Sequence, residues 1–259
     1  MSYHIRSLYS GSSGNSVLIS AGGANILIDA GKSARSLCMA LTAAGTDIKN
    51  IDAIFITHEH TDHTGALEII SKKYSIPVHI TSASAEGMRM GDYLKNAAVI
   101  HTPLFSVNVK DKLSISSFAT SHDSACCVGY RIEFDDEDGH HLIGLATDTG
   151  YVTDAMQKSL CGCESVVLEC NHDLDMLRYG PYPYQLKQRI GSRHGHLSNE
   201  DCAAFAASLA ESGTQRILLA HLSRENNTPD AAFAAVRSAV PDESVTILVA
   251  SPDNIVELI

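Results

Sequence analysis

The chain has 259 residues, of which 44% are hydrophobic, and its formal net charge at pH 7 is -11. An acidic balance of this size excludes a protein that holds nucleic acid mainly through a general positive field, so such a substrate would need local contacts. No stretch reaches the roughly 18 apolar residues of a membrane span, and the first residues lack the apolar run of a secretory signal. The sequence therefore predicts a cytoplasmic protein without a membrane partner, and we expect one domain over residues 1–259.

The predicted elements alternate between strand-like and helix-like runs in both halves of the chain. In the first half, strands are expected at 3–9, 17–20, 24–29, 53–57, 77–81 and 97–102, with helices at 34–44 and 65–73. In the second half, strands are expected at 112–120, 126–134, 141–147, 165–169, 215–222 and 245–249, with helices at 202–210 and 229–238. This order indicates an α/β fold in which two mixed sheets pack face to face with helices outside.

One hexapeptide, His58-Glu59-His60-Thr61-Asp62-His63, follows the apolar run 53–57 directly. Imidazole nitrogen and carboxylate oxygen are ligands that divalent metals prefer. Residues two apart at the end of a strand project to the same side, so we expect His58 and His60 to hold one metal. Asp62 and His63 come at the start of a helix, where they can reach a second metal. A hydrogen-bonded polar loop is the alternative, but four ligand-type residues at this spacing favour the metal site.

Three further polar residues each follow an apolar strand. They are His122, Asp148 and His221. Each, taken singly, could be an interior polar residue that is satisfied by hydrogen bonds, because leaving it unpaired would be costly. Together with the hexapeptide they would complete two metals with three protein ligands each and one shared carboxylate.

The order of these residues resembles the motif order of the metallo-β-lactamase superfamily: HxHxDH, a lone histidine, an aspartate and a C-terminal histidine, over residues 58–221. The resemblance implies the αβ/βα four-layer sandwich of that superfamily. It also implies two ligand sets joined by a bridging aspartate: His58, His60 and His122 for the first metal, Asp62, His63 and His221 for the second, and Asp148 between them. The two divalent ions would be zinc or manganese, with iron as a third option.

His196 comes just before a predicted helix, in Gly195-His196-Leu197-Ser198-Asn199. Cleavage of a phosphodiester needs an acid for the departing oxygen, and histidine can supply it near neutral pH. Packing at the helix entry is the alternative. The resemblance favours catalysis, since phosphodiesterase branches of the superfamily carry an extra histidine between the bridging aspartate and the last histidine ligand. We expect His196 to be this acid and Asp62 to orient a hydroxide shared by two metals.

More locally, the chain is similar to the WalJ (YycJ)-like exonuclease group of this superfamily. The similar segments are 11–16, 121–123, 169–173, 195–199 and 221–227. The similarity implies a DNA exonuclease that digests from 5′ to 3′. Within these segments we expect seven substrate-binding residues: Ser12, Ser13, Asn15, Asn171, His172, Arg224 and Asn226.

The stretch 176–199 contains no aspartate or glutamate. Four basic residues and three tyrosines alternate in it: Arg178, Tyr179, Tyr182, Tyr184, Lys187, Arg189 and Arg193. Basic residues for phosphate and aromatic rings for stacking suit the end of a nucleic-acid strand. A solvated face with core tyrosines is the alternative, and the sequence leaves both open.

Two rival functions share the predicted metal ligands. A small-molecule phosphodiesterase, or another ester hydrolase of the same fold, would be separated from a nuclease by the dependence of cleavage on substrate length. A non-catalytic regulatory metal-binding protein belongs to another class, but no ligand is missing here, whereas decayed family members usually lose some. We therefore expect DNA as the substrate partner and no obligate protein partner.

Overall fold

Two seven-stranded sheets form the centre of the computed structural model, which describes residues 3–259. The first sheet contains, in spatial order, β14 (Val256–Glu257), β1 (His4–Tyr9), β2 (Ser16–Ala21), β3 (Ala24–Ile28), β4 (Ala53–Phe55), β5 (Val78–Thr81) and β6 (Ala98–His101). The second contains β13 (Thr246–Val249), β12 (Arg216–Ala220), β11 (Ser165–Glu169), β10 (Gly139–Ala146), β9 (Val128–Asp136), β8 (Leu113–Ala119) and β7 (Ser106–Val109). Both sheets are mixed. The strands from β3 to β6 and from β10 to β13 are parallel, and the remaining pairs are antiparallel.

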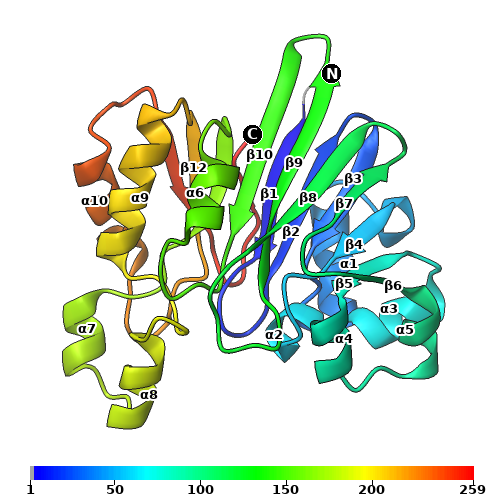
Figure 1. The fold of residues 1–259 in the computed structure, drawn as a ribbon, viewed down its shortest axis with the longest axis horizontal. Helices are drawn as coiled ribbons and strands as arrows, with labels where there is room; N and C mark the ends of the chain where they lie inside the picture. The colour runs from blue at the N-terminus through cyan, green and yellow to red at the C-terminus, as the bar shows by residue number, and fades with distance from the viewer. Residues whose placement is uncertain (1–2) are drawn as a thin grey trace.

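Helices lie on the two outer sides of the paired sheets (Figure 1). Those that follow strands of the first sheet are α1 (Ala34–Ala43), α2 (Thr61–Thr64), α3 (Leu67–Lys73), α4 (Ser82–Gly87) and α5 (Asp92–Ala97), with a 3-10 turn at Ile48–Asn50. Those of the second half are α6 (Asp154–Leu160), α7 (Leu174–Tyr179), α8 (Tyr184–Ile190), α9 (Asn199–Glu211) and α10 (Pro229–Ala239). The resulting order of helix, sheet, sheet and helix confirms the predicted four-layer sandwich.

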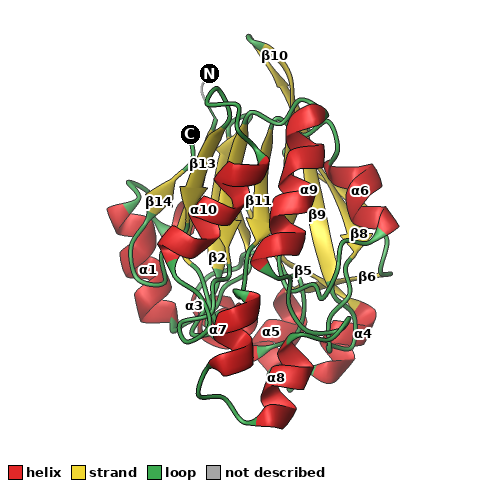
Figure 2. Ribbon diagram, turned by 90° about the vertical axis from the view of Figure 1, so that its left-hand side faces the viewer, coloured by secondary structure: helices red, strands yellow, loops and turns green. Residues whose placement is uncertain are grey.

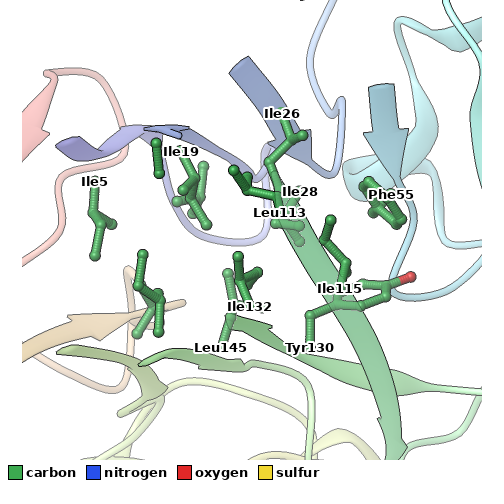
Figure 3. Packing of buried hydrophobic residues seen from close by; sticks show 14 of the residues in the cluster. Ile5, Ile19, Ile26, Ile28, Phe55, Leu113, Ile115, Tyr130, Ile132 and Leu145 are labelled. Atoms are coloured by element: carbon green, nitrogen blue, oxygen red, sulfur yellow. The ribbon is translucent and has the colours of Figure 1, made fainter. Parts of the chain in front are cut away.

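The main core lies between the two sheets, as Figure 3 shows. Ile19 and Ile28 of the first sheet share this cluster with Ile115 and Ile132 of the second, and all four are at most 1% exposed. Strand β9 shows why the sequence forms a sheet. Its alternating residues Val128, Tyr130, Ile132 and Phe134 are buried, whereas some of the residues between them are partly exposed. Burial of each such side chain contributes about 1.5–3 kcal/mol.

Two further apolar clusters join the sheets to their outer helices. In α9, Cys202, Phe205, Ala206 and Leu209 recur at helical spacing and pack in one cluster with residues of β11 and β12. The helix begins three residues before the predicted start at 202, because the Ser198 hydroxyl caps it by accepting a hydrogen bond of 3.1 Å from the Asp201 backbone N–H. Among the described residues, no helix combines the length and apolar character needed to cross a bilayer.

Several short elements of the structure were not predicted from the sequence. They are β7, β14 and the helices α4, α5, α6, α7 and α8. The helices have six or seven residues each, about two turns, which is too short for an apolar period to stand out. The two prolines at 181 and 183 separate α7 from α8, as expected of residues that break a helix.

Candidate active site

The carboxyl ends of five strands bring polar residues to one edge of the sandwich. Strands β3 and β4 run parallel in the first sheet, and β10, β11 and β12 do so in the second. The carboxyl ends of neighbouring parallel strands meet at one edge, which is where α/β folds place their sites. The polar residues that close or follow these strands are at most 3% exposed, and they are Asp29, His58, Asp148, Glu169 and His221.

The structure brings all seven predicted metal ligands together. They belong to four groups in which the ligand atoms lie within 4.8 Å of one another: His58, His60 and His122; His58, His63 and Asp148; Asp62, His63 and His221; and Asp148 and His221 with Glu169 and His196. Asp148 touches both predicted ligand sets, since its Oδ2 lies 3.3 Å from His63 Nε2 and its Oδ1 lies 3.8 Å from His122 Nε2. This arrangement is what a shared, bridging carboxylate requires.

Contacts on the far side of the imidazole rings orient them. Asp29 Oδ2 lies 2.7 Å from His63 Nδ1, and the Gly195 carbonyl accepts a hydrogen bond of 2.9 Å from His122 Nδ1. In metal sites, such partners of the second ring nitrogen set the tautomer and leave the other nitrogen for the metal. The same contacts leave Nε2 of both histidines available as a ligand atom.

Three buried atoms of the predicted ligands have no hydrogen-bond partner among the described residues. They are His58 Nε2, Asp148 Oδ2 and His221 Nδ1, in side chains that are 0%, 1% and 2% exposed. A buried polar atom without a partner is costly. Because these atoms lie in one cluster of imidazole and carboxylate donors, the residues present fit divalent metal ions, which would supply the missing partners.

Backbone strain marks the strand ends that carry these residues. Asp29, Asp148 and His221 have φ angles of 64°, 57° and 56°, in the left-handed region. A non-glycine residue there costs on the order of 1–3 kcal/mol and persists only where the surroundings hold it. Each of the three residues comes at the end of its strand and contacts another polar residue of the site: Asp29 contacts His63, and Asp148 contacts both His63 and His221.

Neighbouring charges set the protonation of the cluster. Burial lowers the pKa of His58 well below its usual value. Although burial also opposes charge on His63, the carboxylates of Asp148 and Asp29 raise its pKa well above the usual value. Burial likewise opposes charge on Asp148, but His221 and His63 hold its pKa well below the usual range. The imidazoles and carboxylates therefore shift one another's pKa, and because metal ligands must be deprotonated, metal binding here should depend on pH.

His196 lies beside this cluster and is held by a carboxylate. Its Nδ1 lies 2.7 Å from Glu169 Oε1, and its ring centroid lies 4.9 Å from that of His122. Glu169 is fully buried, and its Oε2 accepts hydrogen bonds from the backbone N–H groups of Thr149 at 2.8 Å and Leu197 at 3.3 Å. Although burial opposes charge, contact with His196 and His221 lowers the pKa of Glu169. Glu169 is therefore a fixed carboxylate that orients the His196 ring.

A cavity of about 300 Å³ opens onto the cluster and His196. Of the residues predicted to bind substrate, Ser12 and Asn171 line it. Ser13 and Arg224 are exposed and joined by a hydrogen bond of 3.3 Å from Arg224 Nη2 to Ser13 Oγ.

The remaining three predicted substrate-binding residues, Asn15, His172 and Asn226, are buried and do not line this cavity. Asn15 Nδ2 instead lies 3.1 Å from His63 Nε2 and 3.4 Å from Asp62 Oδ2. It therefore contacts two predicted metal ligands, and substrate contact by these three residues stays a prediction.

Asp29 and Glu169 are not among the candidate residues drawn from the sequence. A signal for both was present, because each is an acidic residue that closes an apolar strand run, as Asp148 does. What the sequence does not contain is the partner of each: Asp29 meets His63, 34 residues away, and Glu169 meets His196, 27 residues away.

We expect Asp29→Asn to weaken metal binding by about 10–100-fold, the usual cost of removing a carboxylate that orients a histidine ligand. The variant loses the negative charge that contacts His63 Nδ1. Chelator competition, with metal content read by elemental analysis, measures the affinity. Asp52→Asn is the matched control. Both aspartates accept a backbone hydrogen bond, Asp29 from Thr57 N–H at 2.8 Å and Asp52 from Asn25 N–H at 2.9 Å, but Asp52 lies at the opposite end of β3 and β4. Equal affinities in the two variants would contradict the role of Asp29.

Comparison with known proteins agrees with this geometry. The family model described as beta-lactamase superfamily domain matches residues 24–222, a range that contains all seven predicted ligands. The exodeoxyribonuclease YycJ of Bacillus anthracis is 34% identical over 246 residues, which cover 94% of this chain and 91% of YycJ. The exodeoxyribonuclease WalJ of Streptococcus pneumoniae serotype 2 (strain D39) is 36% identical over 229 residues, which cover 87% of this chain and 83% of WalJ. Among solved structures, the metallo-beta-lactamase fold protein YhfI from Bacillus subtilis has a TM-score of 0.73 at 17% identity and covers 98% of this chain and 99% of YhfI.

Proposed function

The chain belongs to the beta-lactamase superfamily and, within it, to the family of the YycJ and WalJ exodeoxyribonucleases, and on this basis we propose that it is a metal-dependent DNA exonuclease. The observation that carries the proposal is the cavity in which the His/Asp cluster and His196 lie side by side. A metal cluster alone would suit many ester hydrolases of this fold. An adjacent histidine held by a buried carboxylate adds the acid that a phosphodiester with a basic leaving group requires.

Seven residues would hold the metals: His58, His60 and His122 at one position, Asp62, His63 and His221 at the other, and Asp148 between them. The family and the His/Asp cluster imply divalent metal ions. We propose two ions per chain, zinc or manganese by the donor set, with iron as a third option. When bound, such ions supply Lewis acidity toward a phosphoryl oxygen and make a water molecule acidic enough to attack near neutral pH.

Asp62 and His196 divide the proton chemistry. Asp62 lines the cavity, and His63 and His221 lower its pKa although burial opposes charge, so its carboxylate can accept a hydrogen bond from the attacking water. The Glu169 carboxylate only accepts hydrogen bonds, so His196 Nδ1 carries a proton and Nε2 is the nitrogen left for the substrate. A proton on Nε2 then passes to the departing oxygen as the phosphorus–oxygen bond breaks.

A small-molecule phosphodiesterase is the second candidate, and one observation favours it. A volume of about 300 Å³ is at the lower end of ligand cavities and also suits a small diester. The two candidates differ in what lies beyond the scissile phosphate, and only substrate length separates them.

A digestion time course tests the proposal. The purified protein is stripped of metal and reloaded with Mn²⁺ or Zn²⁺. It is then offered single- and double-stranded DNA labelled at either end, matched RNA, and bis-p-nitrophenyl phosphate. We expect stepwise shortening of DNA from one end, with 5′-to-3′ polarity, and no activity in the stripped protein. Cleavage of the small diester alone, with DNA and RNA intact in every metal, would overturn the nuclease and leave the small-molecule phosphodiesterase.

A further inference from the structure

The cavity has a second, apolar part that the hydrolytic chemistry does not use. Tyr182, Leu186 and Ile190 line it together with the metal cluster and His196. All three come from the segment between α7 and α8 or from α8 itself. These two helices project together beyond the ends of the strands, as Figure 2 shows. Because metals, water and phosphate gain nothing from an aromatic and two aliphatic side chains, this wall indicates a ligand with an apolar face.

The charge on this side of the cavity also disfavours phosphate. Arg189 is its basic residue from α8, and it forms an ion pair with Asp123, which lines the same cavity. Asp123 follows the predicted ligand His122, and its Oδ1 lies 3.3 Å from His122 Nε2. With the Arg189 charge balanced in this way, the wall offers contact area for a flat, uncharged group.

Several contacts hold this wall in place relative to the reacting groups. The Lys187 ammonium donates a hydrogen bond of 2.9 Å to the Arg178 carbonyl, which joins α8 to α7. The His196 backbone N–H donates a hydrogen bond of 2.9 Å to the Ile190 carbonyl, which joins the backbone of His196 to the last residue of α8. Gly195 permits the approach, because a Cβ there would lie 2.0 Å from the Ile190 carbonyl oxygen. The wall is therefore set at a fixed distance from His196.

We propose that this wall receives one nucleobase, that of the nucleotide adjacent to the scissile phosphate, with its ring stacked on Tyr182 and flanked by Leu186 and Ile190. The proposal rests on the proposed nuclease function and names how that site recognises its substrate. Stacking on an aromatic ring is the sequence-tolerant way to bind a base. The cavity of about 300 Å³ is at the lower end of the range for ligand sites, which suits a single nucleotide.

The test compares single-stranded DNA that ends in a normal nucleotide with the same strand ending in an abasic residue, at whichever end digestion starts. We expect wild-type protein to remove the normal nucleotide with a kcat/KM about 5- to 150-fold higher, the range for one stacked base. Tyr182→Ala should lose this preference and cleave both strands at the lower rate. Tyr182→Phe keeps the ring and should keep the preference. Tyr93→Ala is the matched control, because Tyr93 is an exposed tyrosine on α5 that does not line the cavity.

The outcomes separate the two proposals. If wild-type protein shortens neither strand, the nuclease function fails and the base site falls with it. If it shortens both at the same rate, or if Tyr182→Ala retains the preference, the base site is overturned while the nuclease function stands. Metal content of each variant is measured in parallel. Should Tyr182→Ala fail to fold, the wild-type comparison of the two strands still decides, and Tyr182→Phe confirms that the ring suffices.

Discussion

Asp148→Ala should lose bound metal and lower DNA cleavage by about 10³-fold or more, because a metal contributes several kcal/mol to transition-state stabilisation and each 1.4 kcal/mol is about tenfold in rate. Asp148 is 1% exposed and contacts histidines of both predicted ligand sets. In the proposed arrangement, its removal takes a ligand from each metal position at once. Elemental analysis after dialysis measures occupancy, and the digestion assay measures activity.

Asp138→Ala is the matched control for this variant, because Asp138 is exposed in the turn between β9 and β10. It should retain the metal content and activity of the wild type. Full metal occupancy in Asp148→Ala would show that Asp148 is not a shared ligand. Loss of occupancy with unchanged activity would instead remove the metals from the reaction.

His196→Ala should keep its metal and lower the turnover of DNA by about 10²–10⁴-fold, the usual contribution of a general acid. His196 is outside the predicted ligand sets and is held through Nδ1 by Glu169 at 2.7 Å. The loss should largely vanish with bis-p-nitrophenyl phosphate, because its leaving group is a weak base that departs without protonation. Turnover of the two substrates by one protein preparation therefore measures the acid step directly.

Two further variants make the result specific. Glu169→Gln should show the same substrate-dependent pattern with a smaller loss, because every group that Glu169 contacts at His196, Thr149 and Leu197 is an N–H donor and an amide NH₂ mismatches one of them. His140→Ala, at an exposed histidine near the start of β10, should behave as the wild type. An equal loss on both substrates in His196→Ala would mean that His196 is not the acid.

The seven candidate metal ligands could be predicted from the sequence because the patterns that indicate them are local. Four of them sit within one hexapeptide, and its short helix α2 starts at Thr61, so spacing alone orders those side chains. Asp148 and His221 follow β10 and β12, parallel strands whose ends meet at one edge. His122 follows β8, which runs in the same direction as β10 because both strands pair antiparallel with β9. A reader of the sequence can therefore find them without knowing how the sheets pack.

The surroundings of the site show the limit of what such local signals can predict. The basic and aromatic stretch 176–199 was open between a nucleic-acid surface and a solvated face with core tyrosines. In the structure, the residues of this stretch lie in different environments, so neither interpretation applies to all of them. Tyr182 and Arg189 line the cavity, while Tyr179 and Tyr184 are 75% and 73% exposed. Two short helices and a proline-containing turn place these residues in different environments. Neither helix is long enough for an apolar period in the sequence to indicate its buried face.

The sequence by itself predicted most of the sheet-forming strands, the family and the candidate metal ligands that the structure brings together, because alternation, residue type and spacing along the chain indicate them directly. Only the tertiary structure decided which carboxylates support the ligands and the acid. Asp29 reaches His63, and Glu169 reaches His196, across gaps of 34 and 27 residues. Contacts of that kind arise from the packing of strands and loops around a shared edge, where burial makes an unpaired carboxylate costly and so selects its partner. No periodicity in the chain records which partner that is.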